Sequence, residues 1–240
     1  MSRIQYSIVI PLKNEHDNVL ELIKELEVVM QKLQSPWELI LINDGSTDST
    51  GALLKELAAQ KAYIRVLEFV KNYGQSSGFD AGFKSARGEF VITMDGDRQN
   101  DPADIPLLLA KIGESDLVCG YRMQRKDSLG KKIISYVSNS IRQSICKDGV
   151  RDTGCSLKVY RSSALKKIKM YQGMHRFLPA LFCIEGFRVM EVPVSHRPRI
   201  KGKSNYTLLN RSFNTIADLL AVHWMRKRHL SYHIKDCCDR

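Results

Sequence analysis

The chain has 240 residues, of which 43% are hydrophobic and 26% are charged, and its formal net charge is +11. This length suits one large α/β domain or two small ones, and the composition is that of a folded soluble protein. No run of 18 apolar residues occurs, which excludes a segment that spans a bilayer alone. The first residues lack the apolar core of a signal peptide, so a cytoplasmic location is expected.

Six cysteines are spread along the chain without a CxxC pair or a zinc-binding spacing, and we expect free thiols in a reducing compartment. Basic residues concentrate between Arg122 and Lys169 and again after Arg197. This balance indicates either an anionic partner (phosphate groups, a membrane surface or nucleic acid) or a solvated basic face. The chain shows no nucleic-acid-binding module and no interleaved aromatic residues, so no nucleic-acid partner is expected.

Short β-rich runs recur at the interval of one strand-plus-helix unit. They are Ser7–Pro11, Glu38–Ile42, Tyr63–Phe69, Glu89–Met94 and Asp116–Gly120. Two amphipathic helical patterns, one around Val19 to Leu33 and one around Leu53 to Ala58, separate the first three runs. Apolar strands that alternate with helices predict an α/β fold of the Rossmann-like kind, in which a mostly parallel sheet is covered on both faces.

The pattern is looser after Tyr121, although further elements are still predicted. They are a helix from Leu129 to about Cys146, a strand at Leu157–Tyr160, helices at Ser163–Lys169 and Arg176–Ile184, and a strand at Phe187–Val194. Because no Pro/Gly/Ser-rich linker divides the chain, we expect one domain over residues 1–207 and a basic, amphipathic extension over residues 208–240.

The extension carries an apolar stripe at helical spacing, followed at once by Arg226-Lys227-Arg228. The stripe consists of Leu209, Phe213, Ile216, Leu220 and Trp224. An apolar face with a tryptophan beside a basic cluster is what a membrane-interfacial helix needs. A helix that packs on its own domain or on a partner subunit explains the pattern equally well.

Polar motifs follow three of the predicted strands, at Pro11–Glu15, Asn43–Thr50 and Met94–Gln99. Each motif alone is typical of a turn with a helix cap, because Asp, Asn, Gly and Ser are the residues that such turns use. The carboxyl ends of parallel strands meet at one edge of the sheet, where α/β proteins bind ligands. Three motifs at that edge therefore favour a binding site.

Asp95-Gly96-Asp97 has the chemistry of a diphosphate site. Bare carboxylates repel a diphosphate, whereas a Mg²⁺ or Mn²⁺ ion between them turns the repulsion into coordination. Gly96 is expected to allow a tight backbone, so that both carboxylates face one cleft. Asp97 is the first choice of metal ligand, with Gln99 as a neutral oxygen ligand or a partner of one, and Asp95 faces the ribose or the metal's water shell.

Together these motifs resemble those of family 2 glycosyltransferases with the GT-A fold, and most closely those of the dolichyl- or polyprenyl-phosphate sugar synthases. The resemblance covers roughly Tyr6 to Trp224. Besides the three motifs above, it rests on Asn72–Gln75 with Gly82, on Asp95–Pro102, on Asp152–Lys158 and on His196–Tyr206.

The resemblance implies a role for each matching residue. The residues implied at the nucleotide-sugar donor are Pro11, Asn14, Glu15, Asp44, Asn72, Gln75, Asp95, Gly96, Asp97, Arg199 and Lys203. Arg122, helped by Lys131 or Lys132, is implied to meet a phosphate, and Arg199 and Lys203 to lie on a loop that closes over the diphosphate and the acceptor phosphate. Asp152 is either an acceptor-side carboxylate or a turn former.

The implied reaction is an inverting transfer of sugar from a UDP- or GDP-sugar to a polyprenyl or dolichyl phosphate at the cytoplasmic face of a membrane. An acceptor phosphate is already anionic, so a strong general base is less necessary. The membrane would be met peripherally or through a separate membrane subunit, and a homo-oligomer is conceivable. Two alternatives stay open: transfer to a sugar hydroxyl of a glycan or glycolipid, and a non-catalytic nucleotide-sugar binder or membrane scaffold.

Overall fold

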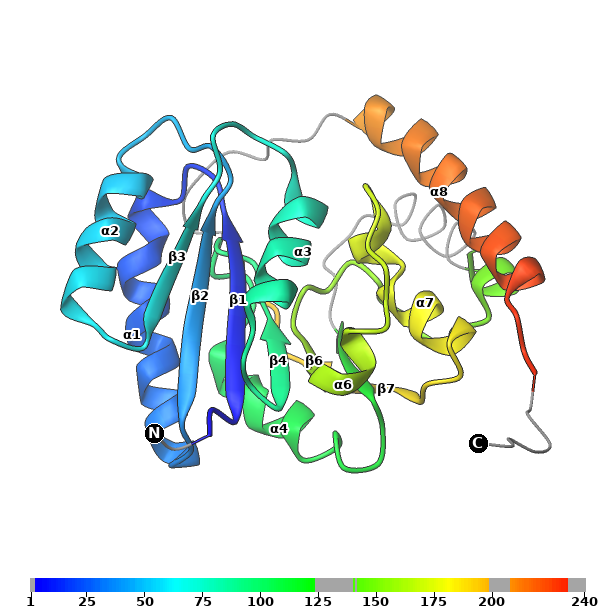
Figure 1. Ribbon diagram of the computed structural model, residues 1–240, viewed down its shortest axis with the longest axis horizontal. Coiled ribbons are helices and arrows are strands. Elements are labelled where there is room, and N and C mark those ends of the chain that lie inside the picture. Colours follow the sequence, from blue (N-terminus) through cyan, green and yellow to red (C-terminus); the bar gives the residue numbers. More distant parts are fainter. Residues whose placement is uncertain (1–2, 124–139, 141, 199–207, 233–240) are drawn as a thin grey trace, which may run out of the picture.

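A computed structural model of the protein describes residues 3–123, 140, 142–198 and 208–232, with residues 208–214 described by their backbone alone. Seven strands form one sheet in the order β3-β2-β1-β4-β6-β5-β7 (Figure 1). The strands are β1 (Tyr6–Leu12), β2 (Trp37–Asn43), β3 (Ile64–Glu68), β4 (Phe90–Thr93), β5 (Leu117–Arg122), β6 (Lys158–Arg161) and β7 (Val189–Val194). Each predicted strand is present, with ends shifted by one or two residues, and the α/β fold is confirmed.

Most of the pairing is parallel, as predicted. β1 pairs in parallel with β2 and with β4, β2 with β3, and β5 with β7. β6 is the exception, because it lies antiparallel between β4 and β5. The carboxyl ends of β1, β2, β3 and β4 therefore meet at one edge, and β5 brings Arg122 to the same edge from the other side of β6.

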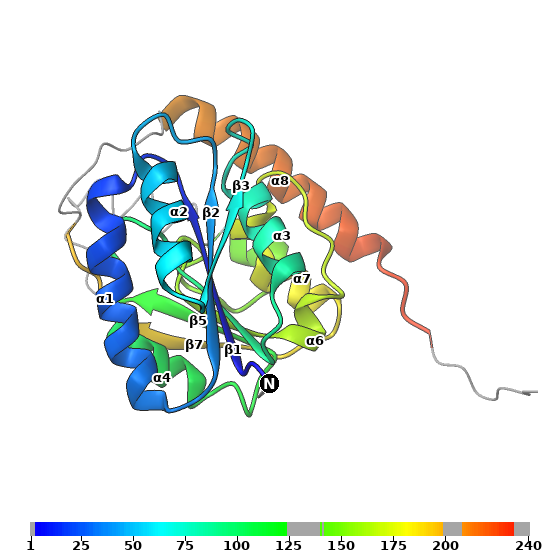
Figure 2. The ribbon, with the colours of Figure 1, turned by 60° about the vertical axis from the view of Figure 1, so that its left-hand side comes forward.

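The helices form a layer on each face of the sheet (Figures 1 and 2). α1 (His16–Leu33), α2 (Thr50–Gln60) and α4 (Ile105–Leu109) cover one face, and α3 (Gln75–Ser85), α6 (Ser162–Leu165) and α7 (Leu178–Ile184) the other. Short 3₁₀ turns, η1 (Pro102–Asp104) and η2 (Met174–Arg176), precede α4 and α7. Alternate strand residues enter the two cores: Ile8 and Ile10 face α1, whereas Val9 faces α3. Most of the helix predicted from Leu129 to about Cys146 lies outside the described residues. Within its predicted range, residues 142–146 are described and are helical.

α8 (Leu208–Arg228) runs along the outside of α7 (Figure 1), and Leu219, Val222 and Met225 in its second half pack inward. Val222 is fully buried in a small core with Met174 and Phe177. The opposite face is open, since Leu220 is 61% exposed and Trp224 is 64% exposed. Within the described part of the chain, no helix has the length and apolar composition needed to cross a bilayer.

The cysteines that the structure describes are free thiols, as expected. Cys119, Cys146 and Cys155 are buried and Cys183 is partly buried. Burial raises the pKa of the Cys146 thiol to about 11, which keeps it protonated and inert at neutral pH.

Candidate functional site

A cavity of about 830 Å³ opens where β1, β2 and β3 end. Its walls include Lys13 after β1, Ser46 after β2, and Glu68, Lys71 and Asn72 at the end of β3 and in the following loop. Lys13 and Ser46 lie in the polar motifs expected at this edge, and Asn72 was implied at the donor. Glu68 and Lys71 were not expected, although the predicted strand Tyr63–Phe69 ends between them and so leads to the same sheet edge.

The carboxylate of Asp44 binds the backbone of a neighbouring loop rather than facing open solvent. The buried carboxylate accepts hydrogen bonds from the backbone N–H groups of Tyr73 at 2.6 Å and Gly74 at 2.9 Å. These contacts fix the loop between β3 and α3, the loop that carries Asn72. Gly74 has φ of 87°, in the left-handed region that favours glycine. The base or ribose role implied for Asp44 stays a prediction, and the structure adds a role in holding this loop.

Asn14 and Glu15 join the loop after β1 to the loop after β2. Asn14 Oδ1 accepts from the Thr47 backbone N–H at 2.8 Å, and the Asn14 N–H donates to Ser46 Oγ at 3.0 Å. The Glu15 N–H donates to Thr50 Oγ1 at 3.0 Å. The two loops therefore form one rigid rim of the cavity. Pro11, also predicted at the donor, is a partly buried residue of β1 just before this rim.

Asp95 and Asp97 follow β4 at the centre of this edge. Asp95 Oδ1 accepts from Gln75 Nε2, on the first turn of α3, at 2.7 Å. Asp97 is buried, and its Oδ1 accepts from the Gln99 backbone N–H at 3.1 Å. Burial, followed by the nearby charge of Asp97, raises the pKa of Asp95, whereas Lys158 and Arg122 act in the opposite direction. The charge of Asp97 therefore reaches the Asp95 carboxylate across this turn.

The carboxylate pair fits a hard divalent cation that shares its ligands with a substrate. Among the described residues, no group of three or more His, Cys, Asp or Glu side chains is placed to hold a metal ion. Asp95 and Asp97 can supply two carboxylates with Gln99 beside them, and phosphate and water oxygens would complete the shell. That sharing is usual for Mg²⁺ at phosphate sites. Burial and the charge of Asp97 raise the pKa of Asp95, and a cation there would offset both effects.

Gly96 is required for a different reason from the one expected. Its φ is not in the left-handed region, so no special backbone conformation demands glycine. A Cβ at this position would instead lie 2.2 Å from Leu12 Cδ2, in the core beneath the site. Glycine allows the turn to pack directly against Leu12 of β1, and this contact fixes how deeply both carboxylates lie in the site.

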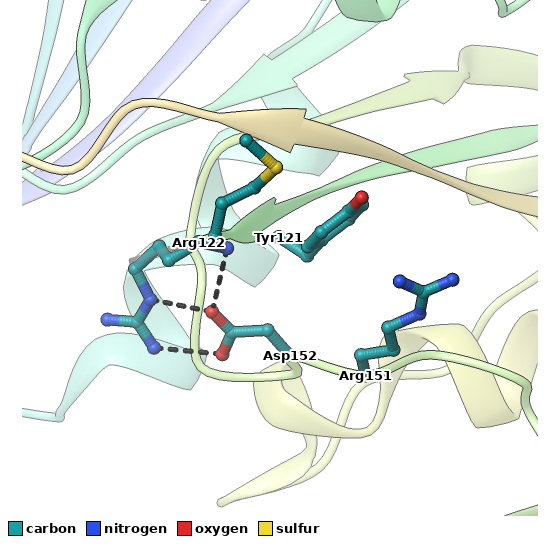
Figure 3. A pocket seen from close by; sticks show the side chains of 5 residues that line it. Tyr121, Arg122, Arg151 and Asp152 are labelled. Atoms are coloured by element: carbon teal, nitrogen blue, oxygen red, sulfur yellow. Dashed lines mark hydrogen bonds and ion pairs between the residues drawn. The ribbon is translucent and has the colours of Figure 1, made fainter. Parts of the chain in front are cut away.

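Arg122 and Asp152 are brought together by the structure (Figure 3). Arg122 Nε and Nη2 donate to the two oxygens of Asp152 at 2.6 and 2.8 Å. They line a second cavity of about 410 Å³ with Tyr121, Met123 and Arg151. The positive charge of Arg122 also opposes the rise in the pKa of Asp95.

Arg197 anchors the segment after β7 against the same turn. Its guanidinium pairs with Glu25 and with Asp101, each at 2.7 Å, and its backbone N–H donates to the Gln99 carbonyl at 2.9 Å. The chain therefore passes beside Asp97 before it reaches residue 199. Arg199 and Lys203, as well as Lys131 and Lys132, lie outside the described residues, and their predicted roles stay predictions.

Lys158 is a buried cation that the sequence reasoning did not single out as a site residue. It is 3% exposed, donates to the Cys155 carbonyl, and contributes a positive charge behind Asp95. It lies in the Asp152–Lys158 motif, but an internal strand position gave no sign that its side chain would approach β4. The antiparallel insertion of β6 next to β4 is what places it there.

A mostly parallel sheet with an acidic pair after β4, at the edge where β1, β2 and β3 also end, is the arrangement of a GT-A domain. The structure matches Mycobacterium tuberculosis glucosyl-3-phosphoglycerate synthase solved with Mn²⁺ and UDP-glucose, with a TM-score of 0.71, 18% identity, and coverage of 92% of this chain and 79% of that one. It also matches Staphylococcus aureus TarS residues 1–349 solved with UDP-GlcNAc, with a TM-score of 0.62, 18% identity, and coverage of 92% and 67%. At these identities the likeness shows the fold.

Sequence comparison defines the family. Residues 7–169 match the model of glycosyl transferase family 2, and the chain belongs to that family. It is 39% identical over 225 residues to dodecaprenyl-phosphate galacturonate synthase of Rhizobium johnstonii, covering 91% of this chain and 66% of the relative. It is 36% identical over 217 residues to undecaprenyl-phosphate 4-deoxy-4-formamido-L-arabinose transferase of Salmonella choleraesuis, covering 89% and 66%. The chain thus spans slightly less than two thirds of the length of these relatives.

Proposed function

We propose that this protein transfers a sugar, with inversion, from a nucleotide-sugar donor to a polyprenyl phosphate. The observation that carries the proposal is the Asp95/Asp97 pair, which follows β4 at the sheet edge that also carries the large cavity and the Arg122 cavity. One cavity suits the donor's nucleoside and the other an anionic acceptor. Relatives whose names specify dodecaprenyl or undecaprenyl phosphate support the acceptor class.

The donor half of the site would work through charge and position. Asn14, Glu15, Asp44 and Asn72 shape the walls for the base and ribose, while Gln75 orients Asp95. A bound Mg²⁺ or Mn²⁺ would offset the charge that develops on the leaving diphosphate. The protein's own task is to hold the carboxylates at a fixed depth, which the contact of Gly96 with Leu12 ensures.

The acceptor half would need no strong base. At neutral pH a phosphate monoester is an anion, so its oxygen can attack the anomeric carbon directly. In-line attack inverts that carbon and expels the nucleoside diphosphate. Arg122, together with Arg199 and Lys203 on the segment after β7, would offset phosphate charge on both substrates.

We further propose that residues 208–240 extend the catalytic domain, residues 1–207, onto the cytoplasmic surface of a membrane. Leu220 and Trp224 are well exposed on the outer face of α8, and Lys227 and Arg228 are exposed at its end. Apolar side chains enter the headgroup region, and each basic residue near anionic lipid adds up to about 1 kcal/mol. Such docking would bring the site to a lipid-linked acceptor.

The reaction can be tested with a panel of UDP- and GDP-sugars, Mg²⁺ or Mn²⁺, and a short-chain polyprenyl phosphate. We expect release of nucleoside diphosphate that requires both the metal and the phosphorylated lipid. The matching polyprenol without its phosphate is the control acceptor. Equal release with the polyprenol or with a free glycan would reject the polyprenyl-phosphate assignment and favour a hydroxyl acceptor.

Asp97→Asn tests the metal assignment without disturbing the turn. The Asn oxygen still accepts from the Gln99 N–H, while the negative charge is lost. We expect turnover to fall about 100-fold or more, and the melting temperature of the metal-free protein to rise because Asp95 no longer faces a second carboxylate. Wild-type turnover by this variant would show that Asp97 is not a metal ligand.

A further inference from the structure

The carboxylate of Asp152 is fully occupied by the protein. Its Oδ2 accepts from Arg122 Nε at 2.6 Å and from the Arg122 backbone N–H at 3.3 Å. Its Oδ1 accepts from Arg122 Nη2 at 2.8 Å and from the Gly154 N–H at 3.1 Å. A carboxylate has about four lone-pair sites, so these donors saturate it. A general base instead needs an oxygen that is open to the proton it removes.

The backbone of Asp152 is fixed as well. Glu191, on β7, accepts from the Arg151 N–H at 2.7 Å and from the Asp152 N–H at 3.3 Å. The loop that carries Asp152 is thus tied to β7 through Glu191 and to the end of β5 through Arg122. Both strands belong to the central sheet, so the pair stands on rigid elements. Fixed geometry of this kind is what a positioning residue needs.

One nitrogen of the Arg122 guanidinium, Nη1, is not used in the pair with Asp152. Nε and Nη2 bind Asp152, and no described residue accepts a hydrogen bond from Nη1. Figure 3 shows Nη1 directed away from Asp152. The positive charge of Arg122 also opposes the rise in the pKa of Asp95.

We propose that Asp152 is a positioning residue that acts through Arg122: it holds the guanidinium so that Nη1 binds a phosphate group of a substrate. The proposal rests on the function proposed above and deepens it. In the transfer, a phosphate oxygen forms the new bond to the anomeric carbon, and the bond from that carbon to the diphosphate breaks with its electron pair. No proton leaves the acceptor, so the step needs no base at Asp152.

The phosphate could belong to the lipid acceptor or to the donor's diphosphate, and a double-mutant cycle distinguishes the two. Arg122→Ala, Asp152→Ala and the double variant are compared by kcat and by KM for each substrate, alongside dissociation constants for UDP and for a short-chain polyprenyl phosphate. We expect each single variant to raise KM for one substrate about tenfold, and the double variant to be no worse. The substrate whose KM rises identifies the phosphate.

The matched control is Asp116–Arg161, an ion pair at the opposite end of β5. Arg161→Ala removes a paired arginine from the same strand pair, so it can change the melting temperature but is expected to leave both KM values unchanged. Arg122→Lys keeps the charge but loses the fork, and should resemble Arg122→Ala.

A different result would overturn the proposal. If Asp152→Asn lowers kcat about 100-fold, removes the acidic limb of the pH profile and leaves KM unchanged, Asp152 is a base. Additive effects of the two alanine variants would also reject the coupling. If the wild type shows no turnover with polyprenyl phosphate while the cycle still shows coupled phosphate binding, the proposed function fails and the positioning role stands.

Discussion

Gly96 lies between the two site carboxylates, and its Cα faces the side chain of Leu12 in the core. A Cβ built at Gly96 would lie 2.2 Å from Leu12 Cδ2, closer than any real contact, and Leu12 is only 2% exposed. Local packing and site geometry are therefore coupled at this residue. Relief of the overlap must move either the core leucine or the turn that presents Asp95 and Asp97.

We expect Gly96→Ala to lower the free energy of unfolding by about 1–3 kcal/mol, the usual cost of overpacking a core, and to weaken metal-dependent turnover. Urea denaturation and the nucleotide-release assay measure the two effects. Gly113→Ala is the control, since nothing lies within 4 Å of a Cβ there and its φ is ordinary. Leu12→Val in the Gly96→Ala background should restore part of the stability; no recovery would mean that the backbone, not Leu12, is the obstacle.

Single residues also mark where prediction from sequence stops. The positions of Asp95, Asp97 and Asp44 at one edge follow from strand ends, which apolar runs reveal. Their partners do not, because the N–H groups that bind Asp44 come from a loop, and the ion pair of Arg122 with Asp152 joins residues thirty apart in the chain. Loop conformations depend on tertiary contacts that no local pattern encodes.

At the scale of elements, the strands were predictable and α3 was not. α3 contains Gly78 and Gly82, which oppose helix formation and hide an amphipathic pattern. The structure supplies the reason for both: a Cβ at Gly82 would lie 2.2 Å from Val9 Cγ1, and one at Gly78 2.8 Å from Pro11 Cβ. Close packing on β1, and not helix propensity, therefore determines α3. This packing also brings Gln75 to Asp95.

The direction of β6 likewise could not be predicted. Its residues predict a strand, but a strand pattern does not tell which way the strand runs in the sheet. β6 nevertheless carries Lys158 to the back of Asp95.

α8 has two faces with different expected functions. Leu219 and Val222 face α7, whereas Leu220 and Trp224 face outward. We expect Leu220→Glu with Trp224→Glu to abolish most binding to vesicles of anionic lipid in a sedimentation assay, with little change in melting temperature, because these side chains contact little protein. Turnover with an acceptor embedded in those vesicles should fall while turnover with a short, soluble acceptor is kept.

The matched control for α8 is Val28→Glu, an apolar-to-acidic change at a residue of α1 that is 53% exposed. It should leave vesicle binding intact. If it reduces binding as much as the α8 variant does, added negative charge explains the effect and α8 is not the docking element.

For the whole molecule, the site joins two halves of the chain, since its donor rim comes from residues before Asp97 and the Arg122–Asp152 pair from residues after Tyr121. Two nearby carboxylates resist a bare diphosphate, so nucleotide and cation should bind together and stabilise the fold by mass action. At a concentration of about 100 times its dissociation constant, a ligand adds about 2.7 kcal/mol to the free energy of unfolding. This corresponds to roughly 5–10 °C in melting temperature for a chain of this size.

We expect UDP or GDP with Mn²⁺ to produce this shift in melting temperature, and the nucleotide with EDTA to produce almost none. The Asp97→Asn variant should lose only the part of the melting-temperature shift that depends on the metal. An equal shift with EDTA would mean that the basic residues alone hold the diphosphate, and the metal would then have no part in donor binding.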